Sequence, residues 1–103
     1  MKGASRSKAD IEFQDRIASI GCIVCRNQGI ENDMVSIHHI EGRTKKSAHR
    51  KVLPLCYQHH QGVDNSKPKR WFTLHGNKAE FEREYGTQYE LLDQCLGIIN
   101  ERA

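Results

Sequence analysis

The sequence predicts a small α+β domain, in which a short β-hairpin is accompanied by an N-terminal helix and by C-terminal helices. Three observations predict this class: apolar residues at helical spacing near both ends, two short apolar segments with strand character between them, and a length of 103 residues. In a single domain of this size the hydrophobic core alone gives only marginal stability. We therefore treat residues 1–103 as one domain and expect a structural metal ion to help hold it together.

We predict one helix near the N-terminus, over about residues 8 to 20. Ser7 and Asp10 resemble a capping box at its start, and Gly21 ends the pattern. Residues 1–6, ahead of this helix, are expected to form a flexible basic arm. Three apolar residues share one helical face: Phe13, Ile17 and Ile20.

Two short strands are predicted in the middle of the chain. Alternating apolar residues over 35–40 predict the first strand, with His38 and His39 near its end. An apolar segment over 52–55 predicts the second strand. The intervening residues 41–51 are expected to form a long basic loop, so that the two strands pair as a hairpin.

Three helical segments are predicted after the second strand. A helix that begins near Tyr57 places His59 and His60 in its first turn, and a short helix follows over residues 79–85. A capping-box pattern at residues 87–90 opens the last helix. Four residues of this helix recur at helical spacing and are expected to face the core: Leu91, Cys95, Ile98 and Ile99.

Matching pairs of ligands predict a structural zinc site. Cys22 and Cys25 lie on a tight turn with two residues between them, and Cys56 and His59 repeat that spacing, so the four side chains can complete a Cys3His tetrahedron. Such a closed site stabilises a fold but leaves no open position for catalysis. The alternative is a set of buried thiols with an unrelated histidine. Cys95 is expected to be a small buried apolar residue.

Charge is distributed unevenly along the chain. The net charge is +3, but residues 43–70 contain eight cationic residues and one acidic residue, whereas residues 78–103 carry a net charge of −3. A solvated charged surface is the common explanation of such a cluster. Its position around the histidines favours a polyanion, above all nucleic acid. The cationic residues of the first segment are Arg43, Lys45, Lys46, Arg50, Lys51, Lys67, Lys69 and Arg70.

The sequence also bears on location. No apolar segment approaches the roughly 18 residues that a membrane span requires, and the first ten residues lack the apolar core of a signal sequence. We therefore expect a cytoplasmic protein without a membrane partner. In such a reducing compartment the four cysteines are expected to be ligands or buried thiols rather than disulfides.

The adjacent histidines His38 and His39 are expected to have different roles. Neighbouring side chains on a strand point to opposite faces, so the two imidazoles do not share one task. One could bind a metal ion while the other activates water, because an imidazole with a pKa of about 6.5 is a competent general base at neutral pH. The alternative for each is a structural or solvent-exposed histidine.

The succession Cys-x-x-Cys, His-His-Ile and Leu-Pro-Leu-Cys-x-x-His-His resembles the HNH endonucleases, with their ββα-metal core. It is most similar to the small phage Ref-type nucleases, which act in recombination enhancement. The resemblance extends from Cys22 to about Gly86 and includes the stretch LHGNKAEFEREYGT. It implies a metal-dependent DNA endonuclease that hydrolyses phosphodiester bonds with little sequence specificity.

The resemblance also implies roles for single residues. His39 takes the place of the general base, and His38 and His60 take the places of ligands to a catalytic Mg²⁺ or Mn²⁺ ion, which Zn²⁺ can replace in a crystal. The further ligand is either Asp64, four residues after His60, or His75, which matches a histidine of the phage relatives. We favour His75.

One part of the family pattern is missing. The middle asparagine, expected shortly before the second strand, is absent, and His49, Arg50 and Lys51 occupy that neighbourhood. His49 either substitutes for it, by orienting the base or contacting phosphate, or is an ordinary loop residue. The departure leaves weak activity, or none, as an open alternative.

Resemblance to the Ref group further implies DNA coated with RecA as a substrate, and the host-cell cytoplasm as the location if the chain is phage-encoded. A second hypothesis is a zinc-stabilised DNA-binding module that does not cut and serves as a recombination accessory. A third is a purely structural zinc protein, which would leave the basic loop without a use.

Overall fold

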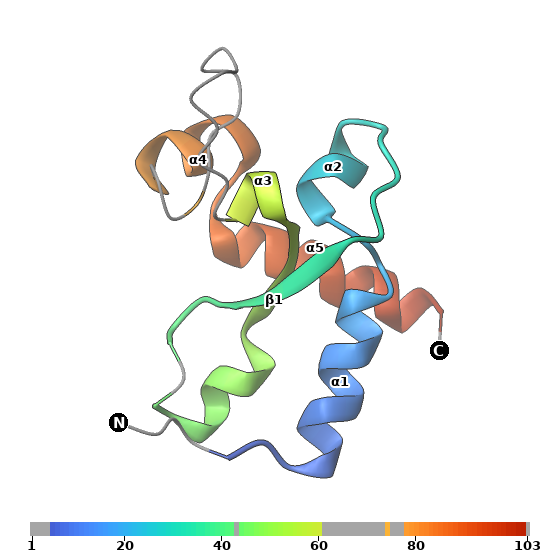
Figure 1. Ribbon diagram of the computed structural model, residues 1–103, viewed down its shortest axis with the longest axis vertical. Coiled ribbons are helices and arrows are strands. Elements are labelled where there is room, and N and C mark those ends of the chain that lie inside the picture. The colour runs from blue at the N-terminus through green and yellow to red at the C-terminus, as the bar shows by residue number, and fades with distance from the viewer. Residues whose placement is uncertain (1–4, 43, 61–73, 75–77, 103) are drawn as a thin grey trace.

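The computed structural model of the chain describes residues 5–42, 44–60, 74 and 78–102, and it has the predicted α+β class. A two-stranded hairpin crosses the centre of the molecule, with helices around it (Figure 1). In chain order the elements are α1 (Lys8–Ala18), α2 (Ile23–Asn27), β1 (Val35–His39), the 3-10 helix η1 (Lys46–Arg50), β2 (Val52–Cys56), α3 (Tyr57–His60), α4 (Lys78–Tyr85) and α5 (Gln88–Glu101).

The hairpin determines where the histidines lie. β1 and β2 pair antiparallel, with Val35 opposite Cys56 and His39 opposite Val52. Every residue of β2 is buried, whereas β1 is mostly half-buried or exposed. β2 therefore forms part of the core, whereas the side chains of β1 are only partly covered, apart from that of the buried His38.

α1 begins as the sequence predicts. The Ser7 hydroxyl accepts from the Asp10 backbone N–H, and the Asp10 carboxylate accepts from the Ser7 N–H, which completes the capping box. The helix ends at Ala18, slightly earlier than expected, and Gly21 follows at a φ of +83°. A Cβ at Gly21 would lie 2.9 Å from the Asn32 carbonyl oxygen, so only glycine fits this turn into α2.

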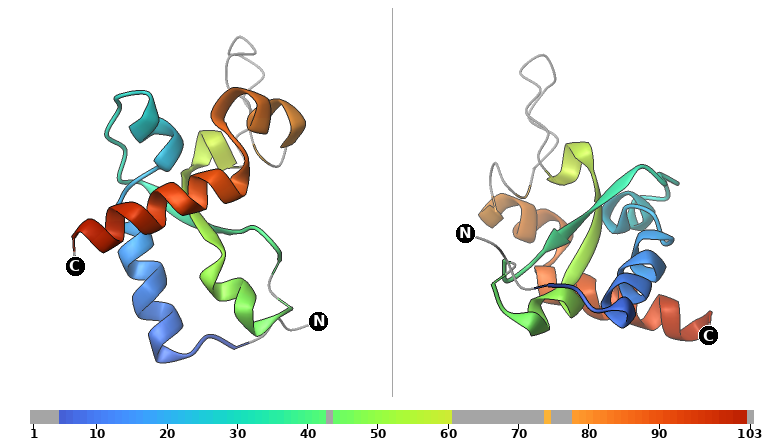
Figure 2. Two further views of the ribbon diagram at one scale, coloured as in Figure 1. Left: turned by 180° about the vertical axis from the view of Figure 1, so that it is seen from behind. Right: turned by 60° about the horizontal axis from the view of Figure 1, so that its bottom comes forward.

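α5 covers one side of the hairpin. It runs behind the strands in Figure 1 and in front of them in the left view of Figure 2, where it also lies against the end of α1. Its capping box, between Thr87 and Glu90, is present as predicted. Cys95 is fully buried in the apolar core, which confirms its predicted packing role. None of the described helices is both long and apolar enough to cross a membrane.

The segment between the strands is more ordered than the predicted loop. It contains η1, in which Ala48 and His49 are buried. The Gln14 side chain of α1 donates to the His49 carbonyl oxygen at 2.9 Å, and Arg50 pairs with Asp10 at 2.7 Å. These contacts join α1 to η1 across 35 and 40 residues of sequence, so local patterns do not reveal them.

Candidate metal centre and histidine cluster

Four side chains from three elements form a buried cluster. Cys22 is the N-cap of α2 and Cys25 lies in its first turn, while Cys56 ends β2 and His59 lies on α3. Each residue is at most 3% exposed, and their ligand atoms all lie within 4.8 Å of one another. The structure therefore brings together all four predicted ligands of the structural zinc site.

The distances match tetrahedral zinc. With Zn–S bonds of about 2.3 Å and a Zn–N bond of about 2.0 Å, a tetrahedron has edges of about 3.8 Å between sulfurs and about 3.5 Å between sulfur and nitrogen. The Cys25 and Cys56 sulfurs are 3.8 Å apart. His59 Nδ1 lies 3.6, 3.5 and 3.2 Å from the sulfurs of Cys22, Cys25 and Cys56. The donor set thus fits a zinc ion.

The electrostatics of the cluster favour a cation. The neighbouring Cys22 thiol lowers the pKa of Cys56 to about 3, and His59 adds to this effect. Contact with Cys56, together with burial, raises the pKa of Cys22, and burial raises the pKa of Cys25. Without a metal ion, this cluster therefore stabilises the thiolate of one cysteine and disfavours ionisation of the other two. A divalent cation favours all three as thiolates and releases protons as it binds.

Neighbouring groups hold the ligands in place. The Cys22 N–H donates to the Asn32 carbonyl at 2.8 Å, and the Asn32 amide donates to the Cys25 sulfur at 3.8 Å. On the other side, the Tyr85 ring meets the His59 ring edge-on at 5.2 Å. The loop before β1 and helix α4 are thereby tied to the cluster, which explains how one ion could stabilise several elements.

A second group of histidines lies outside the Cys3His cluster. The His38 and His60 rings meet edge-on, with centroids 5.0 Å apart, and both side chains are buried. His60 Nδ1 is hydrogen-bonded to the Ser36 hydroxyl at 2.8 Å. Ser36 and His60 also border a surface pocket of about 550 Å³, whose lining includes the exposed Tyr57. A substrate could therefore reach His60 from this pocket.

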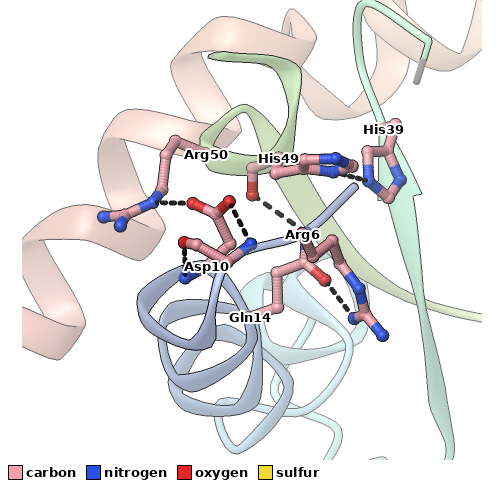
Figure 3. A network of polar contacts seen from close by, with 7 residues as sticks. Arg6, Asp10, Gln14, His39, His49 and Arg50 are labelled. Carbon is pink, nitrogen blue, oxygen red and sulfur yellow. Dashed lines mark hydrogen bonds and ion pairs between the residues drawn. The ribbon is translucent and has the colours of Figure 1, made fainter. Parts of the chain in front are cut away.

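His39 faces another set of partners. Its Nε2 atom lies 3.3 Å from His49 Nδ1, and the two rings meet edge-on with centroids 5.4 Å apart (Figure 3). Figure 3 also shows the chain of contacts beneath them, in which Arg6 donates to Gln14 and Gln14 donates to the His49 carbonyl. Strand alternation thus separates His39 from His38, as predicted.

Four residues of the predicted nucleic-acid-binding set are described, and they fall into two groups. Lys45 and Lys46 are exposed at the start of η1. Arg50 and Lys51 instead form ion pairs, Arg50 with Asp10 at 2.7 Å and Lys51 with Glu41 at 3.1 Å. Arg50 holds the pKa of Asp10 down at about 2. Two of the predicted nucleic-acid contacts are thus already engaged with carboxylates.

Several predicted site residues lie outside the described part of the chain. These include both alternatives for the further catalytic ligand, Asp64 and His75, as well as the basic residues Arg43, Lys67, Lys69 and Arg70. Residues 1–4 of the predicted N-terminal arm are also outside it, although Arg6 donates to Gln14 at 2.8 Å.

Sequence reasoning missed the polar residues that surround the histidines. Gln88, at the start of α5, places its Oε1 atom 2.7 Å from His38 Nε2, and the Ser36 hydroxyl is hydrogen-bonded to His60. A buried glutamine at the start of a helix belongs to no recognisable sequence motif. Ser36 could have been found, because it lies two residues before His38 and therefore on the same face of β1.

The chain also matches a protein-family model over residues 7–100, which is most of its length. The model describes recombination enhancement, RecA-dependent nucleases. The match includes the Cys3His cluster and both histidine pairs. The chain therefore belongs to this family of RecA-dependent nucleases of recombination enhancement.

Proposed function

We propose that the chain is an HNH-type, metal-dependent DNA endonuclease that hydrolyses phosphodiester bonds with little sequence specificity. In this proposal residues 1–103 act as a single HNH domain. The observation that carries it is the division of the histidines by β1: His38 meets His60, while His39 meets His49. A hairpin followed at once by a short helix is also the order of elements in a ββα-metal core.

His38 and His60 would hold the catalytic divalent cation, Mg²⁺ or Mn²⁺. The pair fits this role because two imidazoles from different elements meet at 5.0 Å and one of them, His60, lines a surface pocket. The cation would stabilise charge on the scissile phosphate and on the leaving oxygen. His75 remains our preferred further ligand, ahead of Asp64. Ser36 would keep His60 oriented through its hydrogen bond.

His39 would serve as the general base that removes a proton from the attacking water. It is half-buried, lies next to His38 in sequence and projects from the opposite side of β1. His49 would orient it from η1 and so substitute for the missing asparagine. The buried Gln14–His49 contact supports this role, because it fixes the backbone that carries the His49 ring.

Exposed cations beside η1 would bind the sugar-phosphate backbone. Lys45 and Lys46 are the described candidates, and Arg43, Lys67, Lys69 and Arg70 remain proposed from the sequence. Arg50 and Lys51 contribute less, because Asp10 and Glu41 already neutralise them. Contacts of this kind give affinity that falls with salt and carries little sequence information.

The substrate in this proposal is DNA within a RecA filament. The family description is the support for it, since members are RecA-dependent nucleases. A protein that acts on DNA bound by RecA would work in the compartment where that DNA is found, which is the cytoplasm of a bacterial cell.

The test is a cleavage assay with Mg²⁺ or Mn²⁺, which compares the unaltered protein with His39→Ala. The substrates are naked single-stranded DNA and the same DNA coated with RecA. We expect the unaltered protein to cut RecA-coated DNA and His39→Ala to bind it without cutting. Cleavage by His39→Ala at the normal rate would contradict the assignment of the base. Binding without cleavage by the unaltered protein would favour the non-catalytic DNA-binding module.

A further inference from the structure

Gln88 is a buried polar residue that contacts one of the proposed metal ligands. Its side chain is 5% exposed, and its Oε1 atom lies 2.7 Å from His38 Nε2. The two residues are 50 positions apart in sequence and come from α5 and β1. This contact therefore depends on the tertiary fold and lies outside the histidine and cysteine motifs.

The start of α5 holds Gln88 in place. Thr87 caps the helix and exchanges hydrogen bonds with Glu90, so that the first turn is fixed. The Gln88 backbone N–H donates to the Glu82 carboxylate at 3.0 Å, which satisfies a group that the helix itself leaves without a partner. Because its backbone is held from both sides, Gln88 can direct its amide at His38.

The chemistry of this contact constrains the His38 ring. An amide carbonyl oxygen only accepts hydrogen bonds, so His38 Nε2 must carry the proton and donate it. In a neutral imidazole the lone pair is then on Nδ1. A metal ion binds a ring nitrogen through its lone pair, and a hydrogen bond at the other nitrogen fixes which one is used.

We propose that Gln88 is a positioning residue for the catalytic centre: it holds His38 in the Nε2–H tautomer and presents Nδ1 to the divalent cation. This inference rests on the proposed function, in which His38 is a ligand of that cation. It adds a residue from α5 to a centre otherwise built from β1 and α3. Gln88 touches neither substrate nor metal and acts only through His38.

The first test does not depend on activity. Imidazole ¹⁵N shifts and proton correlations, recorded on the zinc-loaded protein at mildly alkaline pH, report which ring nitrogen of His38 is protonated. We expect the Nε2–H form in the unaltered protein and a mixture of tautomers in Gln88→Met, which keeps the length of the side chain without an acceptor. A predominant Nδ1–H form in the unaltered protein would overturn the inference.

The second test measures Mn²⁺ affinity by titration of the zinc-loaded protein. Loss of a hydrogen bond to a ligating histidine weakens metal binding by about 10- to 100-fold, and we expect Gln88→Met to fall in this range. Gln88→Glu, which keeps an acceptor, should retain most of the affinity. Weak binding by both variants would contradict the inference, because the acceptor would then not be what matters.

Gln94→Met is the matched control. Gln94 lies on the same helix and also makes side-chain hydrogen bonds, but to the exposed Asn27. This variant should keep normal Mn²⁺ affinity, zinc content and His38 tautomer. An equal loss of Mn²⁺ affinity in Gln94→Met and Gln88→Met would show that any change to α5 has this effect, and would overturn the specific role of Gln88.

Different outcomes contradict the proposed function and the role of Gln88. If the unaltered protein neither binds Mn²⁺ beyond its zinc nor cleaves DNA, the proposed function fails. If it does both and Gln88→Met does so equally well, only the role of Gln88 fails.

Discussion

His59 and His60 are adjacent on α3 but lie in different surroundings. His59 is fully buried, and its Nδ1 atom faces three cysteine sulfurs at 3.2–3.6 Å. His60 points the other way, to Ser36 and His38, and borders a pocket open to solvent. One short helix therefore carries a histidine of the closed cluster and, next to it, a histidine of the His38–His60 pair, which lies beside a surface pocket.

The two centres are linked through the backbone of α3. The Cys3His cluster holds β2, α2 and α3 together, and α3 carries His60 to the other side. Loss of the closed cluster should therefore remove both centres, whereas loss of the His38–His60 pair should leave the closed cluster intact.

The largest expected effect comes from a cysteine substitution. Cys56→Ser should abolish stoichiometric zinc binding and cooperative folding, because structural zinc contributes on the order of 10 kcal/mol and small domains are stable by only about 5–15 kcal/mol. Circular dichroism and zinc analysis measure both. The matched variant Cys95→Ala, in the core but outside the cluster, should keep its zinc and lose only modest stability. Folding of Cys56→Ser at normal stability would contradict a structural role for zinc.

A smaller effect is expected at His49, which contacts His39. His49→Ala should reduce the cleavage rate by about 100-fold while leaving DNA affinity and zinc content unchanged, because a misplaced catalytic group costs about that factor. His49→Asn, which restores the residue type of the HNH pattern, should recover part of the rate. Single-turnover cleavage separates these outcomes from binding. Equal rates for His49→Ala and the unaltered protein would show that His49 does not orient His39.

DNA affinity should change less, and in a way that depends on salt. Each lost phosphate contact lowers the slope of log K against log salt by about 0.7–0.9, so the double variant Lys45→Gln, Lys46→Gln should lower it by about 1.4–1.8. Arg102→Gln, beyond the end of α5, serves as the control with a single charge removed. An unchanged slope in the double variant would exclude η1 from the DNA-binding surface.

The smallest effect is expected at the α1–η1 ion pair. Arg50 lowers the Asp10 pKa from 3.8 to about 2, so the pair's contribution to stability is fully present above pH 3.8 and is lost as pH falls through about 2. At neutral pH, Asp10→Asn should therefore melt a few degrees below the unaltered protein. Asp15→Asn, at an exposed position of the same helix, should not. Equal melting temperatures for the two variants would show that the Asp10–Arg50 pair does not stabilise the protein.

The sequence predicted the closed cluster better than the surroundings of the other histidines. Paired two-residue spacings define a tetrahedral site by themselves, and strand alternation alone separates His38 from His39. In contrast, Gln14 reaches His49 across 35 residues and Gln88 reaches His38 across 50. Such contacts arise only when α1 and α5 pack against the hairpin, and no local pattern encodes them.

The same reason explains why the sequence did not distinguish the paired basic residues from the exposed ones. Arg50 and Lys51 belong to a cationic run in the sequence, and a run gives no sign of which charges meet a carboxylate. Their partners, Asp10 and Glu41, lie 40 and 10 residues away. Only the fold distinguishes them from Lys45 and Lys46.

The separation of the two centres on α3 is tested most directly by His60→Ala, assayed for zinc content and for cleavage of RecA-coated DNA in one preparation. We expect one zinc ion per chain, a normal melting transition and no cleavage. Normal cleavage would contradict the role of His60 at the catalytic centre, and loss of the zinc would contradict the independence of the closed cluster.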